Sequence, residues 1–193
     1  LAELVRKTGC GVLLDLNILD SAPEERFDRI TRLAARLFQV PMAFVSLVDA
    51  KRLWFKSRVG FPHTETPSAQ SFCAHAIQRD EMLVVCGAVA DGQFADSPYV
   101  REFPHVRFYA AQPLAVDGVY IGTLCLVDIV AREFGEEERA LLRDLASVVA
   151  NEAAAGALKE AQLRVQRSEA SLRALLEHLP DSLLLLDALG TVV

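Results

Sequence analysis

The sequence lacks a hydrophobic run long enough to cross a membrane. A transmembrane helix needs about 20 consecutive apolar residues, whereas the longest run of the 193-residue chain, LLLLDALGTVV, is short and contains Asp187. A signal peptide is also missing, because residues 1–10 carry charges on both sides of their apolar positions. The chain opens on Leu1 and stops within an apolar run at Val193. We therefore expect a cytoplasmic piece of a longer polypeptide.

Cysteine is scarce, and basic residues are not in excess. The four cysteines fall at irregular spacings without a CxxC pair, which argues against a zinc site or a disulfide framework and favours a reducing compartment. The formal net charge is −6, whereas binding to nucleic acid or to an anionic membrane requires a basic patch. Neither nucleic acid nor a membrane is therefore expected as a partner of this chain.

Catalytic signatures are missing as well. The sequence has no phosphate-cradling glycine loop, no GxSxG motif and no GGDEF or EAL catalytic motif. The carboxylates of Asp91 and Asp96 lie in the turn-rich segment DGQFADS, which favours local hydrogen bonds to the backbone over acid–base catalysis. We therefore predict no catalytic residue in this chain.

What the chain does have is a 52% hydrophobic composition, enough for a sizeable core, and a clear first helix. Ser21 and Glu24 form a capping-box pattern, Pro23 fits the first turn, and Pro41 is expected to end the helix. The apolar residues between these limits recur at helical spacing and give the helix one apolar face: Phe27, Ile30, Leu33, Ala34, Leu37 and Phe38.

Strand-like segments follow, most of them in pairs. AFVSLVDA and RLWFKSRVG flank a turn near residues 49–51, and VRFYAAQPLAV and VYIGTLCLVD flank Asp117–Gly118, a strong hairpin signal. Between the pairs, Ser71 fits the N-cap of a short helix over Phe72–Arg79, and MLVVC predicts a brief strand. Because the strands are apolar on both faces, we expect both faces of the sheet to be covered.

Alternation along the strands assigns side chains to faces. Trp54 and Phe55 are neighbours and must lie on opposite faces of the sheet. The same rule puts Tyr109 with Ala111, away from Phe108. In the last strand it groups Ile121, Thr123, Cys125 and Val127 on one face and Gly122, Leu124 and Leu126 on the other. The sequence does not say which face looks into a pocket.

From Glu136 onward the pattern is that of one long helix, which Pro180 ends. At about 1.5 Å per residue it would run on the order of 65 Å. Its second half carries apolar residues at heptad spacing, which implies a partner helix and hence a parallel homodimer. A solvated linker, or a helix packed on its own domain, is the alternative. The residues expected at the dimer seam are Leu158, Val165, Leu172, Leu175 and Leu179.

Several segments in this order resemble the GAF domain family. They are PEERFDRITRLAARLFQVPMAFVSLVDAKRLWFKSRVG, SFCAHAI, FADSPYV, RFYAAQPLAVDGVYIGTLCLVD and EEERALLRDLASVVANE. The tail, SEASLRALLEHLPDSLLLLDALGTVV, resembles the opening of a PAS domain. The expected organisation is a helical lead-in over residues 1–18, a GAF domain over 19–152, a signalling helix over 153–179 and a truncated PAS domain over 180–193.

The resemblance implies an α+β fold with a central antiparallel sheet of five to six strands and helices on both faces. The first and last helices cover one face and commonly form a parallel dimer, while short helices and loops cover a small-molecule pocket on the other. It further implies a cytosolic sensory and dimerisation module that relays a small-molecule or partner signal through the long helix to a PAS domain and an effector. The effector would be a histidine kinase or a cyclic-di-GMP enzyme, so the parent, unlike this piece, would be an enzyme.

Two alternatives to this function stay open. One is a structural dimerisation module without a ligand, and the other is a thiol-dependent enzyme of the free methionine sulfoxide reductase type that uses Cys73. Bilin-binding members attach their chromophore through a cysteine usually followed directly by histidine, whereas Ala74 separates Cys73 from His75 here. Neither a bilin nor haem is therefore expected, no cofactor is required, and the identity of any ligand stays open.

The segment QSFCAHAI places Cys73 and His75 two residues apart. On a helix, side chains at this spacing point roughly 200° apart, so the pair cannot grip one metal ion or form a nucleophile–base dyad. One cysteine and one histidine also fall short of the ligand set of a zinc site. We expect no metal, and at most one of the two side chains in a pocket. The candidates for lining the pocket, each with core packing as the alternative role, are Phe55, Phe72, Cys73, His75, Tyr109, Ala111, Thr123 and Cys125.

Overall fold

The computed structural model describes residues 10–49, 52–68, 71–79 and 81–177. It contains a six-stranded, fully antiparallel sheet with the strand order β3-β2-β1-β6-β5-β4. The strands are β1 (Met42–Val48), β2 (Arg52–Val59), β3 (Glu65–Pro67), β4 (Leu83–Val85), β5 (Phe108–Val116) and β6 (Val119–Asp128). The helices are α2 (Cys10–Leu16), α3 (Glu25–Leu37), α4 (Phe72–Ala76), α5 (Pro98–Arg101) and α6 (Glu136–Glu177).

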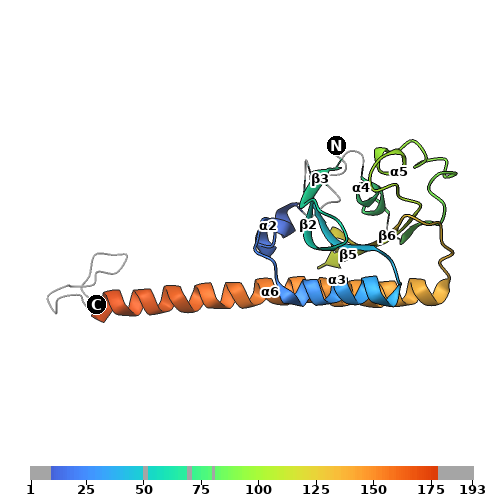
Figure 1. Cartoon of the computed structure of the whole chain (residues 1–193). Helices are drawn as coiled ribbons and strands as arrows, with labels where there is room; N and C mark the ends of the chain where they lie inside the picture. Colours follow the sequence, from blue (N-terminus) through green and yellow to red (C-terminus); the bar gives the residue numbers. More distant parts are fainter. Residues whose placement is uncertain (1–9, 50–51, 69–70, 80, 178–193) are drawn as a thin grey trace. The chain divides into compact units, whose positions relative to one another are not determined.

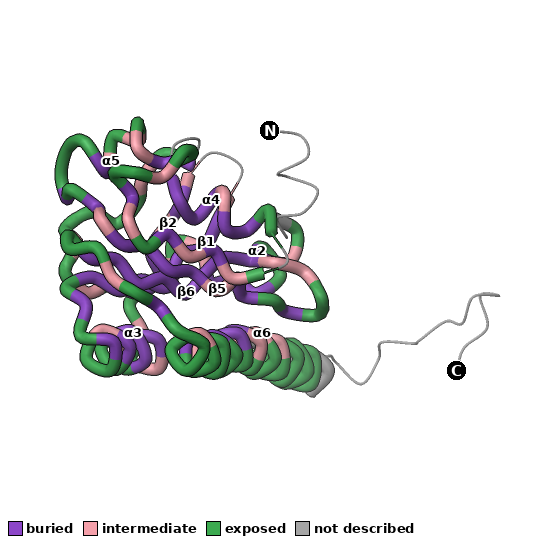
Figure 2. The backbone as a smooth tube through the Cα atoms, turned by 90° about the vertical axis from the view of Figure 1, so that its right-hand side faces the viewer, coloured by how far each residue is buried: buried purple, intermediate pink, exposed green. Residues whose placement is uncertain are grey.

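The chain divides into two units, residues 1–157 and 158–193, which are described separately. In the first unit, α3 and the beginning of α6 lie side by side across one face of the sheet, and α4 and α5 lie on the opposite side (Figures 1 and 2). Arg29 of α3 and Glu152 of α6 form an ion pair at 3.1 Å. This arrangement confirms the predicted α+β, GAF-like architecture with helices on both faces and a long C-terminal helix.

Each face of the sheet carries its own hydrophobic cluster. On the side of α3 and α6, the buried residues include Phe27, Leu126 and Leu142. On the side of α4 they include Phe44 and Tyr109. Both faces are therefore buried, as the apolar strands predicted. Figure 2 shows the central strands as an almost continuous buried layer.

Alternation predicted most of these faces correctly. Phe55 belongs to the cluster under α4, whereas Trp54 packs against the cluster on the other face. Ile121 is the exception, because it lies with Leu124 rather than with Cys125. The cause is a β-bulge that alternation alone does not reveal. Gly122 pairs with Leu114 but Tyr120 pairs with Ala115, which leaves Ile121 as an extra residue on β6.

The hairpin between β5 and β6 turns at Asp117 and Gly118, as predicted. Their φ angles are 51° and 77°, both positive, as a type I′ turn requires. Gly122 has a different role, since a Cβ atom there would lie 1.9 Å from the carbonyl oxygen of Ser46 on β1. The two central strands can therefore approach each other only because this position has no side chain.

The predicted helix ends need correction. The N-cap of α3 is Glu24, so Pro23 precedes the helix and the expected capping box is absent. Ser21 instead donates a hydrogen bond to the carbonyl of Ile18 at 2.7 Å and accepts one from Lys56 at 2.5 Å. At the other end α3 stops at Leu37, before Pro41, because Gln39 takes a φ of 51°. Likewise α4 ends at Ala76 rather than at Arg79.

The described part of the second unit, residues 158–177, is helical throughout. Three of the predicted seam residues, Leu158, Val165 and Leu172, are 63%, 57% and 58% exposed within the single chain. The side chain of Leu175, and the whole of Leu179 and the predicted PAS segment, lie outside the described residues. Dimerisation therefore stays a prediction. Over the described ranges, no helix combines the length and the hydropathy that a membrane crossing demands.

Candidate ligand pocket

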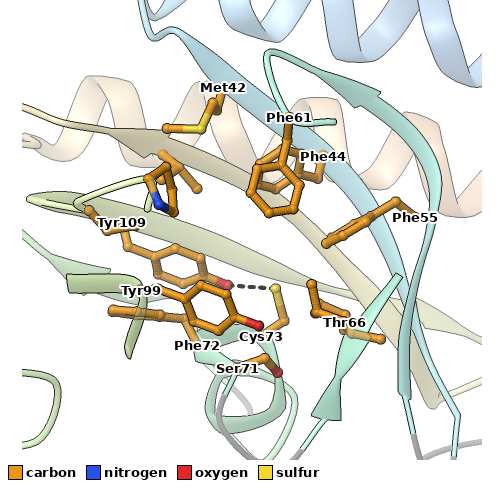
Figure 3. A pocket seen from close by; sticks show the side chains of 14 residues that line it. Met42, Phe44, Phe55, Phe61, Thr66, Ser71, Phe72, Cys73, Tyr99 and Tyr109 are labelled. Atoms are coloured by element: carbon orange, nitrogen blue, oxygen red, sulfur yellow. Dashed lines mark hydrogen bonds between the residues drawn. The ribbon is translucent and has the colours of Figure 1, made fainter. Parts of the chain in front are cut away.

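A cavity of about 50 Å³ lies between α4 and the sheet (Figure 3). Its lining comes from five of the six strands, β1, β2, β3, β5 and β6, from α4 and α5, and from the loops near them. Most of these side chains are buried, whereas Phe61, Thr66 and Tyr99 are half-buried and mark where the cavity approaches solvent. The site therefore occupies the face of the sheet that the family resemblance assigns to a ligand.

Aromatic rings form much of the cavity wall. The ring of Phe44 lies 5.1 Å from Phe55 and 5.5 Å from Phe61, and Phe72 lies 4.8 Å from Tyr109. Such tilted and edge-on contacts are the arrangements that aromatic pairs prefer. The local sequence explains their direction, since Phe44, Phe55 and Tyr109 occupy positions that alternate toward this face on three different strands.

None of the 14 lining residues is an Asp, Glu, Lys, Arg or His. Of the polar groups, Ser71 caps α4, because its hydroxyl accepts a hydrogen bond from the Ala74 amide at 3.1 Å. Tyr109 donates its hydroxyl hydrogen to Cys73. Within the part of the chain that the structure describes, the hydroxyl groups of Thr66 and Tyr99 have no hydrogen-bond partner. These two groups remain available to a ligand in an otherwise apolar cavity.

A chain of small polar groups lies beside the cavity. The Sγ atom of Cys73 accepts a hydrogen bond from the Tyr109 hydroxyl at 3.1 Å and lies 3.5 Å from the Sγ atom of Cys125 (Figure 3). Cys125 Sγ in turn lies 3.3 Å from Thr123 Oγ1, and that hydroxyl lies 2.7 Å from Ser46 Oγ. The two cysteines are 4% and 0% exposed, so their partners are these groups rather than solvent.

The two thiols titrate differently. Hydrogen bonding from Cys125 is the main cause that lowers the pKa of the Cys73 thiol, to about 6; burial opposes it and the bond from Tyr109 supports it. Burial raises the pKa of Cys125 and that of Tyr109 well above their usual values. Cys73 is therefore the group of the three that ionises first, with Cys125 and Tyr109 as protonated donors.

His75 points away from the cavity. Its Nδ1 atom lies 3.1 Å from Nε2 of Gln93, and its ring meets the ring of Phe94 edge-on at 5.3 Å. Burial, with a smaller contribution from Arg79, lowers the pKa of His75 and favours the neutral imidazole. Cys73 and His75 therefore separate as helical geometry predicted. Within the described ranges, no group of three or more His, Cys, Asp or Glu side chains is placed to bind a metal ion.

Four of the eight predicted pocket residues line the cavity: Phe55, Phe72, Cys73 and Tyr109. The other four lie nearby without lining it: His75, Ala111, Thr123 and Cys125. Sequence reasoning missed the other ten of the 14 lining residues, among them Phe44, Phe61 and Tyr99. Alternation along β1 was a signal for Phe44, whereas Phe61 and Tyr99 lie outside the strands, where no periodicity marks a face.

Residues 22–153 match the model of the GAF domain family. The chain belongs to the GAF domain family. A stretch of 136 residues is 38% identical to the cyclic di-GMP phosphodiesterase PA2567 of Pseudomonas aeruginosa and covers 69% of this chain. The same stretch covers only 23% of that relative, so this GAF chain corresponds to less than a quarter of its length.

Solved structures share the fold at low sequence identity. The GAF domain/HD domain protein of Geobacter sulfurreducens is 17% identical, with a TM-score of 0.57 over 77% of this chain and 98% of its own. The free methionine-R-sulfoxide reductase of Neisseria meningitidis, solved with its substrate, is 18% identical, with a TM-score of 0.58 over 76% and 87%. The GAF domain of an Acinetobacter phosphoenolpyruvate-protein phosphotransferase is 15% identical, with a TM-score of 0.57 over 79% and 92%.

Proposed function

We propose that this GAF chain is a cytosolic sensory and dimerisation module of a cyclic-di-GMP signalling protein. The observation that carries the proposal is the aromatic, uncharged cavity on the face of the sheet opposite α6. The likeness to a cyclic di-GMP phosphodiesterase supports a parent enzyme of that kind. The chain itself then supplies input rather than catalysis. We also propose that a PAS domain follows this chain. A histidine kinase is the alternative to a cyclic-di-GMP enzyme as the effector.

The cavity favours a small, uncharged and largely apolar ligand. Without a cationic side chain in the lining, a phosphate or carboxylate would lose its hydration with nothing to replace it, at a cost of several kcal/mol. Thr66 and Tyr99 would supply one or two hydrogen bonds that orient the molecule. A volume of about 50 Å³ holds only a few heavy atoms, so a larger ligand must displace the half-buried ring of Phe61 or Tyr99.

Strand β5 offers a route from the cavity to α6. Tyr109 lines the cavity, while its neighbour Phe108 faces the opposite side. The Phe108 ring packs at a tilt against Phe134, just before α6 begins, with 5.5 Å between the ring centres. A ligand that moves Tyr109 therefore acts on the packing of the helix start. For this to transmit a signal, the ligand must have different affinities for two arrangements of the helix.

Exposed apolar side chains on the helices support dimerisation through a second copy of this chain. In the first unit Leu33 and Leu37 on α3 are 46% and 47% exposed, and Val148 on α6 is 44% exposed. In the second unit Leu158, Val165 and Leu172 repeat every seven residues. A partner helix can bury apolar side chains that repeat at heptad spacing, so we propose a parallel homodimer.

Thermal unfolding with matched small molecules tests the ligand class. Phenol and toluene should raise the Tm of the chain, whereas benzoate, which carries a carboxylate on the same ring, should not, because its charge finds no cation in the lining. A free ligand concentration of one hundred times Kd would stabilise the folded chain by about 2.7 kcal/mol. Val106→Phe, which fills the cavity, should abolish the shift, and Val89→Phe at an exposed site should keep it. Equal shifts with benzoate, or a shift that survives in Val106→Phe, would contradict the proposal.

Two observations support the alternative functions, a structural module and a thiol enzyme. The small cavity suits a structural module that fills its pocket with its own side chains, and a ligand-free crystal structure together with no thermal shift would favour it. The paired thiols suit a thiol enzyme. Turnover of free methionine sulfoxide that is lost in Cys73→Ser would favour that reading, and turnover that is unchanged in Cys73→Ser would remove it.

A further inference from the structure

A pair of thiols lies at the inner end of the cavity, and neither ligand sensing nor dimerisation requires it. Cys73 comes from α4 and lines the cavity, while Cys125 comes from β6 directly behind it. Their Sγ atoms are 3.5 Å apart. Cys86, by contrast, is exposed, with no interaction to either thiol. Two buried cysteines from separate elements therefore meet where a small molecule can reach only one of them.

We propose that Cys73 and Cys125 are a modification site at which a small, uncharged peroxide converts the two thiols into an intrachain disulfide. The Cys73 thiolate attacks one peroxide oxygen, the O–O bond breaks, and the leaving hydroxide takes up a proton and departs as water. The Cys125 thiol then attacks the sulfur of the Cys73 sulfenic acid. The S–O bond breaks, its oxygen leaves as a second water, and the S–S bond forms. Two thiols are oxidised and one peroxide is reduced.

The surroundings of Cys73 fit the role of the attacking group. The Tyr109 hydroxyl on β5 and the Cys125 thiol on β6 both lie within hydrogen-bond distance of its sulfur, and both stabilise a thiolate. The lowered pKa of Cys73 follows from these contacts. No Asp, Glu, Lys, Arg or His side chain lines this cavity beside Cys73, and the titratable His75 of α4 lies on the other side of its helix.

The cavity selects the oxidant by size and charge. A water molecule needs roughly 10–15 Å³ of such volume, so about 50 Å³ accommodates hydrogen peroxide but not a bulky disulfide such as oxidised glutathione. An apolar lining also disfavours charged oxidants. Reaction should therefore begin at Cys73, which lines the cavity, rather than at Cys125, which does not.

Closing the bond must move α4 rather than β6. A disulfide needs S–S of about 2.05 Å, so the sulfur atoms must approach by about 1.5 Å. Strand β6 is held by pairing with β1 and β5 on its two sides, whereas α4 is a five-residue helix. Because Phe72 and Cys73 of α4 both line the cavity, oxidation would reshape it. This last consequence rests on the proposed ligand function, but the disulfide itself does not.

Peptide mapping after peroxide treatment tests the proposal. The reduced 193-residue chain is exposed to hydrogen peroxide, alkylated and digested with trypsin, which separates peptides 59–79, 80–101 and 108–132, each with one cysteine. The fourth cysteine, Cys10, falls in peptide 8–26. The expected product is a cross-link between peptides 59–79 and 108–132 with the loss of two hydrogens, reversed by dithiothreitol. Cys86→Ser should form it equally well. The proposal would be overturned if the folded chain forms no such cross-link, or if disulfides between other pairs of its cysteines form at the same rate.

The order of the steps has its own test. In Cys125→Ala, dimedone should trap a sulfenic acid at Cys73, whereas in Cys73→Ala the Cys125 thiol should stay largely unlabelled. Tyr109→Phe, which leaves all cysteines in place, should slow cross-linking about tenfold near pH 7 and move the rate profile to higher pH, since one thiolate donor is lost. An unchanged profile in Tyr109→Phe, or equal labelling of Cys125 in Cys73→Ala, would refute the assignment. Loss of thermal shift with phenol while the cross-link still forms would reject only the ligand function.

Discussion

Lys56 shows how a single residue can connect two elements of this fold. Its side chain has no exposed surface, and its ammonium lies 2.6 Å from Glu24 Oε1. It also donates hydrogen bonds to the Ser21 hydroxyl at 2.5 Å and to the Ala22 carbonyl at 2.9 Å. A buried charge is tolerated only with such partners. The residue therefore joins β2 to the segment that precedes α3.

Replacing Lys56 by methionine should destabilise the chain although the side-chain volume is nearly kept. The half-buried carboxylate of Glu24 and hydroxyl of Ser21 would each lose one partner, although Glu24 keeps Arg26. Removing one partner of a fully buried pair costs 3–5 kcal/mol; because Glu24 is 36% exposed, we expect a smaller loss of about 2 kcal/mol. Urea unfolding at pH 7 measures the difference, and Lys159→Met, at an exposed position of α6, is the matched control.

The deficit of Lys56→Met should also depend on pH. Burial acts to raise the pKa of Glu24, but hydrogen bonds and charge from Arg26 and Lys56 prevail and lower it below its usual 4.5. A carboxyl with a lowered folded pKa contributes stability above its unfolded pKa and loses it as pH falls through the folded value. The gap between wild type and Lys56→Met should therefore shrink below about pH 4.5. A gap that widens there would contradict this account.

At the scale of elements, the two central strands, β1 and β6, approach each other closely at a position that no sequence pattern indicates. Gly122 pairs with Leu47 on β1 and with Leu114 on β5, so its backbone is enclosed on both sides. Next to it, the bulge at Ile121 turns one extra side chain toward α6. A bulge and a glycine together therefore set the faces of β6, where alternation alone assigned Ile121 to the wrong one.

Gly122→Ala should be among the most destabilising small substitutions in this chain. Its Cβ atom would lie 1.9 Å from the Ser46 carbonyl oxygen, so the central strands would have to separate. We expect a loss of at least about 3 kcal/mol, or a fall in Tm of about 10 °C. Gly92→Ala, where nothing lies within 4 Å of the added atom, should change Tm little. Equal Tm values for the two variants in differential scanning calorimetry would contradict the proposed strand contact.

At the scale of the molecule, one sheet separates the face that carries the cavity from the face that carries α3 and the beginning of α6. Phe44 and Tyr109 face the cavity, while Phe108 and Leu126 on the same strands or their neighbours face α3 and α6. In the signalling function that we propose, the outer surface of the helices contacts a partner. The exposed heptad of the second unit, with Leu172 at 58% exposure, makes that partner a second copy in our proposal.

Leu172→Lys should therefore weaken the dimer, because the charged ammonium groups of two lysines, one from each copy, would meet at the apolar seam. Light scattering across a concentration series should show wild-type dimer where Leu172→Lys is monomer. Ala170→Lys, also exposed but on the opposite side of the helix, should stay dimeric. If wild type is monomeric at high concentration and both variants behave identically, the relay through a dimer fails.

Local patterns in the sequence were enough for most of the elements, the hairpins and most strand faces, but they missed the short strand β3 and the short helix α5, whose segments were predicted to be a loop and turns. Turn chemistry such as Asp117–Gly118 and the period of apolar residues act over a few neighbours, so they can be recognised without coordinates. The divergence of Cys73 and His75 followed from helical geometry in the same way. The matching segments also placed the chain in its family.

Contacts between distant residues depended on the folded chain. Cys73 and Cys125 are 52 positions apart, and nothing in either local segment indicates that their sulfur atoms lie 3.5 Å from each other. The capping box at Ser21 failed because Lys56, far along the chain, takes its hydroxyl. Local sequence sets which conformations are favourable, whereas packing and buried hydrogen bonds choose among them, because an unsatisfied buried group costs more than a local preference contributes.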